Sequence, residues 1–275
     1  MPDFNEIFLE KLPEVSVAVL TLNRPQYHNA LNADIRLEIE AAVDDVAADG
    51  DIGALVLIGG GTRAFSVGAD LRDPRTDHSV SDFAEYIVGR RRRQRWYDIL
   101  THYPKGVVTA ANGYVAGSGL QLALTGDVLI GTESAEFWVP QVALGLAPHV
   151  GTLVKLARII GQQRMLSLIL TGSRLSSRDA EAWGLLSEIV PFERLRERAI
   201  EVAAAIARQP RLSVQMTKES YFRAIDMPWD QSMEVDELKA FSMFQTPDRR
   251  NRHQRRKAEL GIPVAGKDGP ESAAR

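Results

Sequence analysis

Short continuous runs of apolar residues alternate along most of the chain with longer segments whose apolar positions recur every three or four residues. The apolar runs have the length of buried strands and predict strands at 15–22, 52–58, 107–111, 128–131 and 186–190. The periodic segments predict helices at 33–48 (with Asn32 as N-cap), 82–101, 149–160, 162–170 and 178–183, and one that begins at Leu120. This alternation indicates an α/β chain.

The pattern changes near residue 195, after which almost every segment has helical periodicity. The first of these helices has its apolar positions on one face, at Leu195, Ala199, Val202, Ala203 and Ile206. We therefore expect a core at 1–195, a helical region at 196–265 and a polar tail at 266–275. The apolar stripes of the helical region need partners, so we expect that this region does not fold alone.

Composition is that of an ordinary globular protein, with 275 residues, 45% hydrophobic and 25% charged positions. The net charge of −3 gives no general attraction to nucleic acid or anionic membrane, and the absence of cysteine excludes disulfides and thiolate metal sites. Residues 1–10 lack a signal-peptide pattern, and no apolar run approaches the ~18 residues of a membrane span. We expect a cytoplasmic protein without nucleic-acid, membrane or metal partners.

Two glycine-rich segments, 65–71 and 111–121, have the local sequence of a paired backbone donor site. Each follows an apolar run and consists of small residues, which let a backbone amide approach a ligand closely and tolerate positive φ. A helix begins after the second segment, so the N–H groups of its first turn lack acceptors within the helix. The pair has the form of a site that holds a thioester oxyanion. Either segment alone is equally compatible with a purely structural turn.

Further short sequences occur in order around these two segments. They are Leu22-Asn23-Arg24-Pro25, Asn29-Ala30-Leu31-Asn32, Ala135-Glu136-Phe137, Pro140, Leu144-Gly145, Pro148, Leu170-Thr171-Gly172 and Ala180-Glu181-Ala182-Trp183-Gly184-Leu185. With them, roughly the first 225 residues resemble the crotonase superfamily of enoyl-CoA hydratases and isomerases. The resemblance implies a spiral of β-β-α units followed by a C-terminal helical oligomerisation region, which builds a homotrimer or a hexamer.

The resemblance also implies a reaction class and a pair of donors. The substrate would be an acyl-CoA of fatty acid metabolism, with coenzyme A as part of the thioester and no tightly bound cofactor. The oxyanion donors would be the amides of Ala69 and Ser118, the latter at a position where the family usually has glycine. Because the donor is a backbone group, serine keeps the function.

The positions expected to carry the two catalytic glutamates of a hydratase are instead Gln121 and Gln141. A carboxamide neither takes nor gives protons near neutral pH, and a positioned acid or base contributes ~10²–10⁴ in rate. We therefore expect weak standard hydratase activity with retained CoA-ester binding. Two other interpretations remain open: the glutamines fill a polar pocket, or they orient water or substrate while another group moves protons. An engineered double replacement is a further alternative.

His149 is the candidate for that other group. It follows Pro148 at the predicted start of a helix, and an imidazole with a pKa near 6.5 can act as acid or base at neutral pH. A helix N-terminus would lower that pKa by disfavouring the cation. The alternative is that His149 caps the helix or bonds a backbone carbonyl.

The resemblance places coenzyme A over the loops at 24–31 and 64–72, with the adenine read by backbone between Ser66 and Asp70. The expected contacts are Arg24, His28, Ala30, Ser66, Ala69, Asp70, Leu71 and Arg72. Arg24, His28 and Arg72 would meet phosphates through charge-assisted hydrogen bonds. Each of the three is equally readable as an ordinary surface charge, and Asp70 as a residue that orders its loop.

Three functions follow from these observations. The favoured one is an enoyl-CoA hydratase/isomerase-like enzyme, a lyase or isomerase that stabilises an enolate with atypical proton donors. The second is a hydrolase, dehalogenase or decarboxylase variant in which His149 and a held water act on the substrate. The third is a non-catalytic acyl-CoA binder of the same fold.

Overall fold

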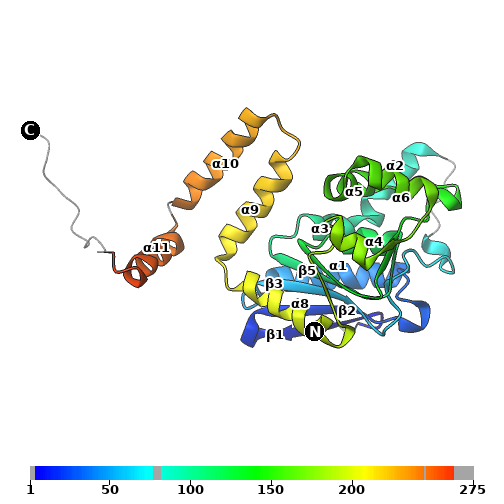
Figure 1. The fold of residues 1–275 in the computed structure, drawn as a ribbon, viewed down its shortest axis with the longest axis horizontal. Helices are drawn as coiled ribbons and strands as arrows, with labels where there is room; N and C mark the ends of the chain where they lie inside the picture. The colour runs from blue at the N-terminus through cyan, green and yellow to red at the C-terminus, as the bar shows by residue number, and fades with distance from the viewer. Residues whose placement is uncertain (1–3, 77–81, 245, 263–275) are drawn as a thin grey trace, which may run out of the picture. The chain divides into compact units, whose positions relative to one another are not determined.

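The computed structural model describes residues 4–76, 82–244 and 246–262, and Figure 1 shows its fold. The chain forms two compact units, 1–211 and 212–275. The boundary lies after Arg211 rather than at the predicted residue 195, because helix α8 (Phe192–Ala207) packs on the sheet of the first unit. The predicted tail at 266–275 lies outside the described residues.

A six-stranded sheet forms the centre of the first unit, in the order β1-β2-β3-β5-β7-β10. β1 and β2 are antiparallel, and the other neighbours are parallel. The strands are β1 (Ile7–Leu12), β2 (Val17–Leu22), β3 (Ala54–Gly59), β5 (Gly106–Ala111), β7 (Val128–Thr132) and β10 (Glu188–Val190). All strands predicted from apolar runs are present in this sheet, and β1 is an additional one.

A second, four-stranded sheet has the order β4-β6-β8-β9. Its strands are β4 (Ala64–Ser66), β6 (Tyr114–Ala116), β8 (Glu136–Trp138) and β9 (Leu175–Ser176). In chain order β3, β5 and β7 of the large sheet each lead to a strand of the small sheet, β4, β6 and β8, and then to at least one helix. This repeated path confirms the predicted spiral of β-β-α units.

The helices of the first unit are close to those predicted. They are α1 (Ala33–Ala48), α2 (Phe83–Arg93), α3 (Arg95–Thr101), α4 (Ser118–Ala123), α5 (Thr152–Ile160), α6 (Gln162–Thr171), α7 (Ser177–Ala182) and α8. The Asn32 side chain accepts a hydrogen bond from the Ile35 amide at 2.8 Å, which confirms the N-cap of α1. The helix predicted at 82–101 is interrupted at Gln94, between α2 and α3.

The large sheet is covered on both faces, as the alternation along β2 shows. Ala18, Leu20 and Leu22 join the core that includes α1, α3 and α4, whereas Val17 and Val19 pack on the other face with α8. The predicted site residues lie in the loop between β2 and α1, in and after the strands of the small sheet, in α4 and just before α5.

The second unit consists of helices α9 (Arg211–Ala224), α10 (Trp229–Phe244) and α11 (Pro247–Glu259). Neither α9 nor α10 has a buried residue, although both carry large apolar side chains. Among the helices described in either unit, none combines the length and apolarity needed to cross a membrane.

Candidate active site

The loop after β4 presents the amide of Ala69. Leu31 donates its N–H to the Gly68 carbonyl at 2.7 Å and accepts from the Asp70 amide at 3.2 Å, so Leu31 and Ala69 form a parallel bridge. In such a bridge the N–H of the central residue points away from the paired strand. Within the described part of the chain the Ala69 amide has no acceptor. Its donor is therefore directed away from Leu31 and remains available.

The turn between β6 and α4 lies directly against this loop. Gly117 has φ 51°, and Ser118 is the first residue of α4, where no described residue accepts from its amide. Gly68 has φ +93°, and a Cβ added there would lie 3.0 Å from the Ser118 nitrogen and 2.8 Å from the Ala116 oxygen. Both conditions favour glycine. The structure thus brings together the two segments that carry the predicted donors.

Gln121 lies one turn along α4 and is almost completely buried. Its Nε2 donates to Thr152 Oγ1 at 3.0 Å and to the His149 carbonyl at 3.3 Å, and lies 3.4 Å from His149 Nδ1. The Thr152 hydroxyl donates a hydrogen bond to the His149 carbonyl at 2.6 Å, so the Thr152 oxygen acts as the acceptor for Gln121 Nε2. Oε1 of Gln121 is buried and has no hydrogen-bond partner among the described residues.

Gln141 approaches the same turn from the end of β8. Its residue is 8% exposed, and a Cβ added to Gly117 would lie 3.7 Å from Gln141 Nε2. Oε1 of Gln141 is also buried, and no residue in the described part of the chain bonds to it. Gln141 therefore lies beside the segment 117–121, to which Gln121 belongs, and each glutamine has a buried oxygen that can accept a hydrogen bond.

His149 lies just before α5, which begins at Thr152 with Gly151 as N-cap. The helix predicted from residue 149 therefore begins three residues later, at Thr152. His149 is an exposed residue, but neighbouring atoms desolvate part of its imidazole, and this lowers the pKa of His149 together with the positive charge of Arg36. A lowered pKa leaves the ring neutral at pH 7, with Nδ1 facing the Gln121 amide.

Arg24 and Asp70 tie together the loops that the resemblance assigns to coenzyme A. Arg24 is buried, pairs with Glu6, donates to Asp70 Oδ2 at 2.9 Å and donates to the Ala30 carbonyl at 2.6 Å. Burial raises the pKa of Asp70, but hydrogen bonds from Arg72 and Arg24 outweigh it and hold that pKa below its ordinary value. The Arg24 guanidinium is thus committed to internal partners.

The other predicted coenzyme A contacts differ in accessibility. The Ser66 hydroxyl is buried and donates to the Asn29 carbonyl at 2.7 Å, whereas Leu71 is exposed. Arg72 is largely exposed, and its guanidinium lies 3.9 Å from the centre of the Tyr27 ring. His28 is partly exposed beside Tyr114. Of the three predicted phosphate contacts, Arg72 and His28 keep side-chain surface that a ligand can reach.

Sequence reasoning missed two residues of this region. Thr152 holds Gln121 and His149 together, and the only signal for it is a hydroxyl residue just after Gly151. Arg36 is a mostly buried cation on α1 whose charge acts on His149. An arginine on an amphipathic helix ordinarily lies in solvent, so its sequence carries no signal of burial.

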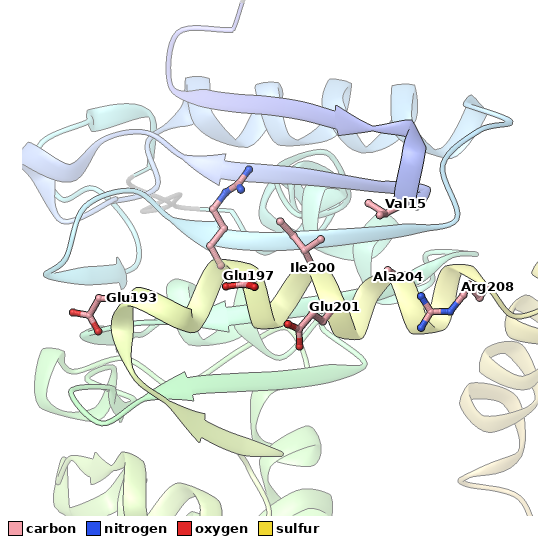
Figure 2. Close-up of a pocket in the computed structure, with 8 residues that line it drawn as sticks. Val15, Glu193, Glu197, Ile200, Glu201, Ala204 and Arg208 are labelled. Carbon is pink, nitrogen blue, oxygen red and sulfur yellow. The ribbon is translucent and has the colours of Figure 1, made fainter.

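A separate groove runs along α8, on the other face of the large sheet from α1 and α4 (Figure 2). Val15, Ile200 and Ala204 give it an apolar floor, and charged residues of α8 border it. None of the predicted site residues lines this groove. Among the residues described, no three His, Asp or Glu side chains gather as a metal site requires.

Comparison with known proteins places the chain in a family. The sequence profile described as Enoyl-CoA hydratase/isomerase matches residues 13–259. The chain is 33% identical over 249 residues to the mitochondrial enoyl-CoA hydratase of Pongo abelii, covering 90% of this chain and 83% of that protein. It is 28% identical to a short-chain-enoyl-CoA hydratase of Clostridium acetobutylicum, covering 90% and 93%. The crystal structure of an enoyl-CoA hydratase from Bacillus anthracis superposes with a TM-score of 0.84 at 27% identity, covering 93% and 97%.

Proposed function

Since this chain belongs to the enoyl-CoA hydratase/isomerase family and is a hydratase/isomerase-like enzyme, we propose that it binds a CoA thioester and stabilises the enolate of its acyl group. The observation that carries this proposal is the pair of amides, Ala69 and Ser118, which lie on adjoining turns without acceptors among the described residues. A thioester oxygen held between them gains two hydrogen bonds that strengthen as negative charge develops, and each such donor contributes about 10²–10³ in rate.

Proton transfer in this site does not come from the two glutamines. Their buried Oε1 atoms accept hydrogen bonds and so orient a water or a substrate hydroxyl beside the acyl group. Because each missing acid or base removes ~10²–10⁴ in rate, standard hydration is expected to be weak. The glutamines keep the site polar but cannot act as the general acid and base that hydration requires.

His149 is the proposed proton-moving group. It lies beside Gln121, and its lowered pKa keeps the imidazole neutral at pH 7, which is the state that a general base requires. The same arrangement supports the second candidate, in which His149 activates a water for a hydrolase, dehalogenase or decarboxylase reaction. A silent acyl-CoA binder would keep the Ala69 and Ser118 donors but use no proton-moving group.

Coenzyme A itself is proposed to lie over the 24–31 and 64–72 loops. Arg72 and His28 supply reachable polar groups for its phosphates, while Arg24 and Asp70 hold the loops in register. The adenine would be read by backbone groups between Ser66 and Asp70. The ion pair between Arg24 and Asp70 fixes the conformation of these two loops before coenzyme A binds.

Hydration of crotonyl-CoA, followed at high enzyme concentration, tests the role of the glutamines. We expect a slow native rate and a rise of about 10²-fold or more in the double variant Gln121→Glu, Gln141→Glu, because positioned carboxyl groups are restored. Thr171→Val, which removes an exposed hydroxyl at the end of α6, serves as the control and leaves the rate unchanged. Native hydration at ordinary hydratase rates would contradict this account of the glutamines.

His149→Ala distinguishes the remaining candidates. An enzyme that uses the imidazole loses its native turnover while calorimetry shows nearly unchanged affinity for butyryl-CoA. An unchanged rate would remove His149 from the mechanism. Binding of butyryl-CoA with no product from a panel of acyl-CoA esters would instead identify the silent binder.

The proposed assembly is a homotrimer or hexamer built through the C-terminal helices. Large apolar side chains of α9 and α10 are exposed in the single chain, which indicates surfaces that other subunits cover. A cytoplasmic location, and the absence of nucleic-acid and membrane partners, remain part of the proposal.

A further inference from the structure

Arg36 occupies an unusual position on α1. It lies one turn after the Asn32 cap, and the residue before that cap, Leu31, is paired with Ala69. The first turn of α1 is therefore tied to the loop that carries the Ala69 amide. The Arg36 guanidinium lies 5.9 Å from the centre of the Trp96 ring, which is itself buried. These contacts keep the Arg36 side chain partly buried, with its Nε shielded from solvent.

Among the described residues the guanidinium has no carboxylate partner, and its Nε is buried without a hydrogen bond. The acidic residue whose charge acts on Arg36 is Asp73, whose carboxylate is already bonded to Arg75 and to the Ala33 amide. An arginine cannot shed its proton, so the positive charge persists in a place where burial makes it costly.

Leu31 bridges Ala69 and Asn32 caps α1, so the Arg36 residue lies within about one helical turn of the loop that carries the first proposed donor. Its positive charge also lowers the pKa of His149, which lies against Gln121 on α4. Arg36 therefore lies on the side of the site where the acyl group would lie. The loops proposed for the coenzyme A phosphates have their own exposed group in Arg72.

From this placement we infer that Arg36 pairs with a carboxylate on the acyl group, so that the substrates are CoA monothioesters of dicarboxylic acids. A guanidinium fork that is otherwise unpaired binds a carboxylate through two parallel charge-assisted hydrogen bonds. The inference rests on the proposed function, because it presupposes that an acyl-CoA occupies the site. The inference specifies that the acyl group is negatively charged, a property that membership of the family does not determine.

Calorimetric titration with a matched pair of ligands tests the inference on the full chain. Glutaryl-CoA carries the distal carboxylate, and pentanoyl-CoA has the same acyl length without it. We expect the native protein to bind glutaryl-CoA about 10- to 100-fold more tightly, the range for a hydrogen bond to a charged group. In Arg36→Met, which keeps an unbranched apolar stem but removes the guanidinium and its charge, the ratio of the two dissociation constants is expected to fall to about one.

Arg95→Met is the matched control. It removes an exposed arginine of α3 that bridges to Glu40 and Asp44 of α1, and it is expected to keep the native preference. Equal binding of both esters by the native protein, a preference for pentanoyl-CoA, or a glutaryl preference that survives Arg36→Met would overturn the inference. If neither ester binds the native protein, the proposed function itself fails. This failure is distinct from failure of the inference, in which both esters bind but the preference for glutaryl-CoA does not depend on Arg36. Circular dichroism confirms that each variant is folded.

Discussion

At the scale of single residues, the surroundings of Gln121 are suited to a hydrogen-bond donor. Both groups that its Nε2 contacts most directly, the His149 carbonyl and Thr152 Oγ1, are acceptors. A carboxylate at position 121 would place its negative charge against the carbonyl oxygen. The Gln121 side-chain amide therefore donates hydrogen bonds that an ionised glutamate at this position could not donate.

This arrangement predicts how the Gln121→Glu variant behaves. Burial and the facing carbonyl disfavour the charged form, so we expect the introduced carboxyl to have a pKa raised above its ordinary ~4.3. Any gain in crotonyl-CoA hydration should then increase as pH rises from 6 to 8. Isotope-edited infrared spectroscopy of the carboxyl group measures this titration. An ordinary pKa would show that the facing carbonyl does not control the position.

The pKa of His149 offers a test of its coupling to Arg36. The positive charge of Arg36 lowers that pKa, so Arg36→Met should raise it. A base that must be neutral loses activity below its pKa, and the acidic limb of the pH–rate profile should therefore move to higher pH in the variant. Titration of the imidazole by nuclear magnetic resonance measures the shift directly. An unchanged or lower pKa of His149 in the variant would show that the charge of Arg36 does not act on His149.

The sequence predicts part of this site and not the rest, for physical reasons. Gln121, Gln141 and His149 were singled out through the family resemblance, which relates them to nearby glycines and prolines. Arg36 and Thr152 depend on which atoms meet across elements that are distant in sequence. Arg24 was expected at a phosphate, but its internal partners Glu6 and Asp70 become visible only when the loops are folded together.

At the scale of elements, the large sheet was predictable except for β1, and the small sheet was not. Strands buried on both faces have continuous apolar runs, which periodicity detects in β3 and β5. The strands of the small sheet have two or three residues, too few to show any period. They were expected only through the family resemblance, although they carry the loops of the site.

One side chain joins two of these elements across the site. Thr152, at the start of α5, accepts from Gln121 of α4 and donates to the His149 carbonyl. Thr152→Val keeps the shape but leaves the Gln121 amide with one acceptor fewer, and we expect a loss of about 1–3 kcal/mol in the free energy of unfolding. Turnover should fall as well, because His149 and Gln121 lose their common anchor.

Denaturant unfolding and steady-state kinetics measure the two effects of that change. Thr152→Ser keeps the hydroxyl and should restore both stability and rate, which a role in simple packing would not predict. If the valine and serine variants behave alike, the hydroxyl does not link α4 to α5.

At the scale of the whole molecule, the exposed apolar surface of the second unit predicts association. Trp229, Leu238 and Phe241 of α10 are each more than 60% exposed in the single chain. We expect sedimentation velocity to show a trimer or hexamer, and Leu238→Glu with Phe241→Glu to shift it toward monomer. Glu237→Gln, on the same helix, serves as the control and should not. A native monomer at micromolar concentration would contradict the proposed assembly.

The central claim is that the amides of Ala69 and Ser118 polarise one thioester carbonyl. Infrared difference spectroscopy of butyryl-CoA labelled with carbon-13 at that carbonyl measures this without requiring turnover. We predict that binding lowers the carbonyl stretching frequency, that Ser118→Pro abolishes the shift, and that Ser118→Ala keeps it. Proline is tolerated at the first position of a helix, so this variant removes the donor without removing α4. An unchanged frequency for the fully bound native complex would contradict the account.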